Sequence, residues 1–75
     1  MKQVEKRRIT LAAARVNAGY TQAEVAAILH IGKQTLCNWE NGKTEPKTSQ
    51  AQLLAELYNW PYGQIIFLPV ESNKI

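Results

Sequence analysis

The stretch TQAEVAAILHIGKQTLCNWENG, residues 21–42, constrains the fold most, because it contains signals for two helices and a tight turn between them. TQAE fits a capping box: the Thr21 side chain caps the backbone at the start of a helix, and Glu24 reaches back to it. This helix is expected to run to about Leu29. The letters HIG interrupt the helical pattern, and a second helix is expected from about Lys33 to Asn41.

The turn and the helix ends carry their own backbone signals. His30 lies where a positive φ is required, and histidine tolerates that region better than most residues. Gly32 can serve as the N-cap of the second helix, although less well than serine. Gly42 is placed to end that helix in a left-handed conformation.

Apolar side chains lie on one side of each of these two helices. Val25, Ile28 and Leu29 form the predicted buried side of the first helix. The second helix has a narrower apolar face, made of Leu36 and Trp39. The pair therefore needs further helices to cover it.

The rest of the chain supplies those helices. Thr10 is placed to cap a helix that begins near Leu11 and ends at Gly19. After a loop marked by Pro46, a fourth helix is predicted at about residues 49–58, with Ala51, Leu54, Ala55 and Tyr58 facing the core. A short fifth helix is predicted at about residues 61–67. This pattern is typical of a compact all-α domain of five helices.

Length and composition limit the classes of protein to which the chain can belong. Its 75 residues suffice for one domain with one small core, and no apolar run approaches a membrane span. The net charge of +3 gives a mild preference for anionic partners. The single cysteine, Cys37, can form neither an internal disulfide nor a zinc site, which indicates a reducing compartment.

Catalytic chemistry is not indicated by any motif. The sequence has no paired carboxylates, no cluster of metal ligands, no nucleophile–base arrangement and no phosphate-binding glycine loop. We therefore expect no enzymatic activity, no catalytic residues, no metal, no cofactor and no small-molecule substrate.

Polar side chains on the second helix of the opening pair suit a nucleic acid. Lys33, Gln34 and Asn38 fall on one arc of roughly 100–140°, on the side away from Leu36 and Trp39. Glutamine and asparagine can bond bidentately to adenine, and lysine can donate to guanine O6 and N7. The same residues could simply solvate an exposed face, and composition alone favours that simpler interpretation.

The wider pattern resembles a known family. The runs GYTQAEVAAIL and TLCNWENGKTEP, and their spacing to LLAELYNW and II, are similar to the helix-turn-helix domain of the Cro and C1-type repressors, the XRE family. The resemblance covers residues 11–68. It implies a lambda-repressor-like DNA-binding domain at residues 9–68, preceded by a basic arm at 1–8 and followed by a tail at 69–75.

The resemblance also implies roles for individual residues. The base-reading positions correspond to Lys33, Gln34 and Asn38. The positions that contact the DNA backbone correspond to Gln22, which also braces the recognition helix, and to Thr35, Asn41 and Lys43. Arg15 and Glu40 match a pair that commonly forms a structural salt bridge. The departures are His30, where glycine is frequent, Gly32, where serine or threonine is frequent, and Glu45, in a loop that is often positive.

The resulting hypothesis is a sequence-specific transcriptional regulator, a Cro/C1-like repressor of phage or mobile-element type, in the cytoplasm of a bacterium or an infected host. It would bind a double-stranded DNA operator as a homodimer, with no membrane partner. Phe67 and Leu68 are the first candidate dimer contacts. Two alternatives remain: a protein-interaction module, and an antitoxin or restriction–modification controller with the same fold.

Overall fold

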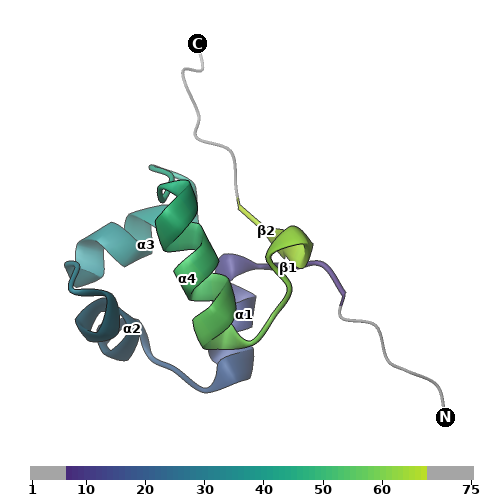
Figure 1. Cartoon of the computed structure of the whole chain (residues 1–75). Coiled ribbons are helices and arrows are strands. Elements are labelled where there is room, and N and C mark those ends of the chain that lie inside the picture. Colours follow the sequence, from purple (N-terminus) through teal and green to yellow (C-terminus); the bar gives the residue numbers. More distant parts are fainter. Residues whose placement is uncertain (1–6, 68–75) are drawn as a thin grey trace, which may run out of the picture.

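The structure, a computed structural model, describes residues 7–67. Most of the predicted basic arm, the candidate dimer contact Leu68 and the tail lie outside the described residues. The secondary-structure elements, shown in Figure 1, follow in this order: β1 (Ile9–Thr10), α1 (Leu11–Ala18), α2 (Gln22–Leu29), α3 (Lys33–Asn41), α4 (Thr48–Tyr58), the 3-10 helix η1 (Tyr62–Gln64) and β2 (Ile65–Ile66).

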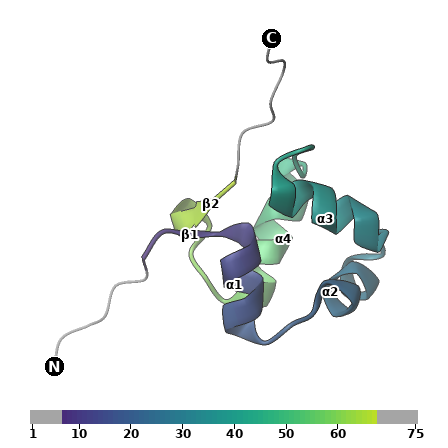
Figure 2. The same ribbon diagram turned by 180° about the vertical axis from the view of Figure 1, so that it is seen from behind.

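The described elements pack in two groups. On one side α2 packs against α3, and on the other α1 contacts α4 and both short strands. Figures 1 and 2 both place the strands at the end of the domain away from α2. The helix-turn-helix formed by α2 and α3 is thus supported from behind by α1 and α4.

Local capping explains where the helices begin. The Thr10 hydroxyl accepts a hydrogen bond from the backbone N–H of Ala13 at 3.1 Å, which confirms the predicted cap of α1. The capping box of α2 is complete: Thr21 Oγ1 accepts from Glu24 N at 3.1 Å, and Glu24 Oε1 accepts from Thr21 N at 2.8 Å. Helix α4 begins at Thr48, one residue before its predicted start.

Left-handed residues end each of the four α-helices. Gly19, His30, Gly42 and Asn59 have φ values of 88°, 58°, 77° and 56°. The predicted positive φ of His30 is therefore confirmed. Because His30 reverses the chain after α2, its backbone conformation sets the angle at which α3 leaves the turn.

The core lies where the four α-helices meet. The predicted apolar faces of α3 and α4 are confirmed, since Leu36 and Leu54 are fully buried and Trp39 is 6% exposed. The predicted burial of Ile28 is wrong, because its side chain is 49% exposed. The predicted burial of Val25 is confirmed, Leu29 is partly buried against the core, and the small Ala26 is the other buried residue of α2.

The predicted fifth helix at 61–67 is also wrong. Only residues 62–64 form a 3-10 helix, and Ile65–Ile66 then pair in parallel with Ile9–Thr10, with Ile9 opposite Ile65 and Thr10 opposite Ile66. Isoleucine favours extended backbone, and Ile65 is buried by this pairing. A partner more than fifty residues away decides the conformation here. The described fold therefore has four α-helices instead of five.

Trp60 contacts the first described residue, Arg7, beside the pair of short strands. Its indole Nε1–H donates to the backbone carbonyl of Arg7 at 2.9 Å, and the ring packs partly buried against the core. Together with the pairing of β1 and β2, this contact holds residues 7–10 against the C-terminal part of the described chain.

The buried hydroxyl of Tyr58 predicts a change in alkaline stability. Tyr58 is 2% exposed, and its hydroxyl has no hydrogen-bond partner among the described residues. Burial, together with the nearby Glu40 charge, raises the pKa of Tyr58. The unfolded state therefore loses this proton from about pH 10 upward while the folded state keeps it, so stability falls as the pH rises.

We expect Tyr58→Phe to remove that loss. The variant should be within about 1 kcal/mol of the parent at pH 7, since the hydroxyl makes no bond. Above about pH 10 the free energy of unfolding of the variant should exceed that of the parent, and the difference should grow by up to about 1.4 kcal/mol per pH unit. Urea unfolding at pH 7, 9 and 11 measures this difference. If the free energy of unfolding changed with pH equally in the two proteins, the prediction would be contradicted.

Candidate nucleic-acid interface

Helix α3 has two faces with different surroundings. Leu36 and Trp39 are buried in the core, whereas Lys33 and Gln34 are exposed and Asn38 is half-buried. The buried pair fixes the rotation of the helix about its own axis. The structure thereby places the three predicted base-reading residues on the outward side of α3.

Two amide side chains on this outward face contact residues one turn away. Gln34 Nε2 donates to Asn38 Oδ1 at 3.0 Å, and Asn41 Nδ2 donates to Cys37 Sγ at 3.4 Å. Both contacts join residues four apart, which lie next to each other on a helix surface. The Gln34–Asn38 bond joins two of the predicted base readers, and sequence reasoning did not anticipate it.

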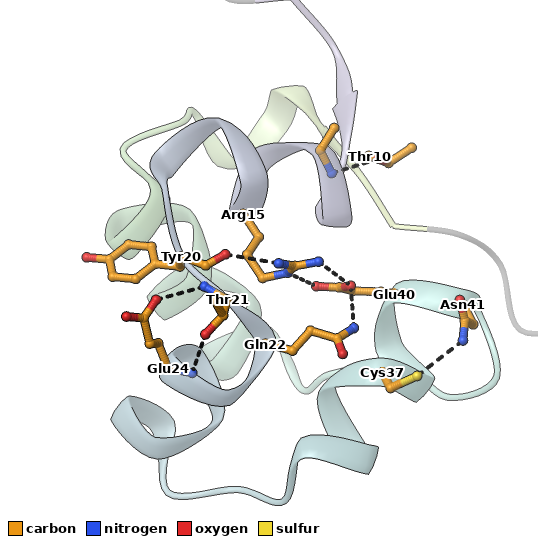
Figure 3. Close-up of polar contacts among 10 residues, drawn as sticks. Thr10, Arg15, Tyr20, Thr21, Gln22, Glu24, Cys37, Glu40 and Asn41 are labelled. Atoms are coloured by element: carbon orange, nitrogen blue, oxygen red, sulfur yellow. Dashed lines mark hydrogen bonds and ion pairs between the residues drawn. The ribbon is translucent and has the colours of Figure 1, made fainter.

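A hydrogen-bonded cluster around Glu40 locks α3 to α1 and α2 (Figure 3). Arg15 Nε donates to Glu40 Oε2 at 2.7 Å and Arg15 Nη2 donates to Glu40 Oε1 at 3.3 Å. Arg15 Nη1 also donates to the Tyr20 carbonyl at 2.9 Å. The side chains of Arg15 and Glu40 are 15% and 5% exposed, so the pair is largely shielded from water.

The carboxylate of Glu40 favours the charged form of Arg15. The hydrogen bond with Glu40 raises the pKa of Arg15 above its ordinary value, although burial opposes this effect. The carboxylate and the guanidinium form a two-point contact that fixes both distance and orientation.

Gln22 connects the first residue of α2 to the same cluster. Its Nε2 donates to Glu40 Oε1 at 2.9 Å, so it reaches the recognition helix through Glu40 (Figure 3). This position matches the bracing role that the family resemblance implied. One amide hydrogen and the amide oxygen of Gln22 remain available to other groups.

The other predicted backbone-contacting residues lie near the two ends of α3. Thr35 is half-buried near its start, while Asn41 and Lys43 are exposed at its end. The backbone N–H of Lys43 donates to the Asn38 carbonyl at 2.9 Å, which holds the chain just beyond α3 in place. Glu45 is exposed in the following loop.

The candidate dimer contact lies at the far corner of the domain. Phe67 is half-buried, and its ring centroid is 5.8 Å from that of Tyr62. Its ring is therefore already partly used within the chain. Of the predicted basic arm, Arg7 and Arg8 are described, and both are exposed.

Two of the contacts that were not predicted from the residues differ in their causes. The Gln34–Asn38 bond could have been found, since two amides four residues apart on a helix signal such a contact. The contact between Gln22 and Glu40 joins residues eighteen apart on different helices. No local pattern indicates it.

Residues 7–67 contain neither of two other features that would point to a different function. Within this range, no group of three or more histidine, cysteine, aspartate or glutamate side chains could hold a metal ion. None of the described helices is both long enough and apolar enough to cross a membrane.

Comparison with known proteins agrees with this geometry. The chain is similar to the HTH-type transcriptional regulator ImmR of Bacillus subtilis (strain 168), with 46% identity over 46 residues. The match covers 61% of this chain but only 36% of that relative. No solved structure matches the chain significantly. The helix-turn-helix family model matches residues 11–62, which include α1 to α4, and the chain therefore belongs to the Cro/C1-type (XRE) helix-turn-helix family.

Proposed function

We propose that the chain is a sequence-specific DNA-binding transcriptional regulator that inserts α3 into the major groove. The observation that carries this proposal is the division of α3 into a buried face, Leu36 and Trp39, and an outward polar face. The outward residues Lys33, Gln34 and Asn38 have side chains that can bond to base edges. The similarity to ImmR supports a regulatory role.

Contacts with the DNA backbone would set the depth and angle of α3. In this proposal Gln22 and Thr35 bond to phosphates near the start of α3, and Asn41 and Lys43 do so near its end. Phosphate contacts of this kind position a protein on the duplex without reading sequence. The Glu40 cluster supports this arrangement, because it fixes the start of α2 relative to α3.

A homodimer would present two copies of α3 to one operator. Helix-turn-helix dimers bind half-sites about 34 Å apart, in successive turns of the major groove. Phe67, which directly follows β2, and Leu68, which lies outside the described residues, remain the proposed dimer contacts. We further propose that the chain is a repressor of phage or mobile-element type that acts on DNA in the cytoplasm. In this proposal it has neither catalytic activity nor a small-molecule ligand.

Selection of bound sites from a random DNA pool tests this function. We expect an enriched palindrome whose half-sites are centred about one helical turn apart. Affinity for that site should fall steeply between 50 and 200 mM salt, because counterions are released from phosphates on binding.

The same experiment separates the proposal from a protein-interaction module. A module that binds a protein partner would enrich no DNA motif, and such an outcome would overturn the proposal. An enriched motif without two-fold symmetry would be consistent with sequence-specific DNA binding but would contradict binding as a homodimer.

A further inference from the structure

The contact between Gln34 and Asn38 changes what the recognition helix can offer to DNA. Gln34 is exposed in the first turn of α3, and Asn38 is half-buried one turn later. The Gln34 Nε2–H donates to Asn38 Oδ1 at 3.0 Å. The amide oxygen of Asn38 is therefore turned toward Gln34 before any DNA is present.

We propose that Gln34 and Asn38 form one recognition unit, in which Gln34 orients Asn38 so that Asn38 offers only N–H donors to the base edges. This inference rests on the proposed function. A carboxamide carries an oxygen acceptor and two N–H donors, which branch from one carbon in different directions. Because Oδ1 already accepts from Gln34, the Nδ2 group of Asn38, which has no hydrogen-bond partner among residues 7–67, is the part of the amide that remains for the DNA.

The orientation predicts which bases the unit reads. An asparagine whose oxygen and nitrogen both face one base favours adenine, because adenine offers N7 as acceptor and N6–H as donor. An amide that offers only donors instead matches acceptor edges, which are guanine O6 and N7 or thymine O4. Gln34 keeps its Oε1 as an acceptor and one Nε2 hydrogen as a donor, which match the N6–H donor and the N7 acceptor of adenine. The unit thus reads adenine at Gln34 and guanine or thymine at Asn38.

A consequence follows for a base pair that Gln34 does not touch. Removing the Gln34 amide frees Asn38 Oδ1, and Asn38 can then turn both of its polar atoms toward one base. The preference at the Asn38 position should shift from guanine or thymine toward adenine. If the two side chains acted independently, that position would not change.

Site selection with the full chain and four variants tests this inference. Gln34→Ala should alter the preference at two base pairs in each half-site. The base pair read by Gln34 should lose its adenine preference, and the base pair read by Asn38, which Asn38→Ala identifies, should also change. Gln34→Met, which keeps the length of the side chain without an amide, should give the same two changes. Lys33→Ala is the matched control on the same face and should leave the base pair at Asn38 unchanged.

Binding of these variants to the selected operator gives a second measurement. The affinity loss of the Gln34→Ala/Asn38→Ala double variant should be smaller than the product of the two single losses by about fivefold or more, since bonded residues are not additive. Multiplicative losses, or a change at only one base pair in Gln34→Ala, would overturn the inference while leaving the proposed function intact. If the parent chain enriches no motif, both fall. Circular dichroism checks that each variant is folded.

Discussion

Replacing Glu40 with alanine will lower the free energy of unfolding by about 3 kcal/mol, a large fraction of the stability of a domain this small. The variant leaves the guanidinium of Arg15, 15% exposed, with only the Tyr20 carbonyl among its three hydrogen-bonded contacts. It also removes the acceptor of the Gln22 amide. A charge left largely buried without its partner costs far more than an intact pair contributes.

Urea and thermal unfolding measure this effect. A loss of about 3 kcal/mol corresponds to a fall in Tm of more than about 12 °C in a domain of this size. Glu56→Ala is the matched control, because Glu56 is an exposed glutamate on α4, and it should change stability by less than about 0.5 kcal/mol. If the two substitutions lowered the free energy of unfolding equally, the contacts of Glu40 with Arg15 and Gln22 would not stabilise the packing of α3 against α1 and α2.

A double variant separates the charge from the packing. Arg15→Met combined with Glu40→Leu removes both charges and keeps side chains of similar volume. We expect it to recover most of the stability lost in Glu40→Ala, since apolar replacements of buried pairs are often neutral or stabilising. If the double variant is as unstable as Glu40→Ala, the loss comes from geometry and not from the unpaired charge.

Lys33→Ala will weaken binding to the selected operator by about 1–3 kcal/mol and relax specificity at one base pair. The proposed reason is that Lys33, exposed at the first residue of α3, donates to guanine O6 and N7. Lys43→Ala is its matched control, since it removes the same charge from the exposed chain just beyond the same helix.

The two lysine variants should differ in kind. Lys43→Ala should weaken binding to all sequences alike and reduce the slope of log affinity against log salt by about 1, as expected for a phosphate contact. Binding to the preferred operator and to versions changed at single base pairs, at several salt concentrations, measures both. Loss of discrimination in Lys43→Ala, or uniform weakening in Lys33→Ala, would reverse the proposed roles.

Much of the local structure could be predicted because its causes lie within a few residues. The capping box at Thr21 and Glu24 and the left-handed end at His30 each depend on neighbours in the chain. The buried face of α3 follows from the three-residue spacing of Leu36 and Trp39. For the same reason the outward position of Lys33 and Gln34 could be predicted before the structure was known.

The errors occurred where distant segments compete with local pattern. Ile28 has the spacing of a core residue, but α2 turns Val25 and Ala26 toward the core and leaves Ile28 at the surface. Residues 65–66 follow a proline and a short turn that would suit a helix. They become a strand because residues 9–10 offer backbone partners and a place to bury Ile65.

The sequence by itself determined the helix-turn-helix, its boundaries and the outward polar face of its second helix, since short-range capping and periodicity control these features. How that helix is held depends on the tertiary structure: the family resemblance implied the Arg15–Glu40 pair, but no local pattern indicated it. Arg15, Gln22 and Glu40 come from three different helices, and their contacts exist only once those helices have packed. The parallel pairing of β1 with β2 likewise depends on closing the whole chain, so no local pattern could specify it.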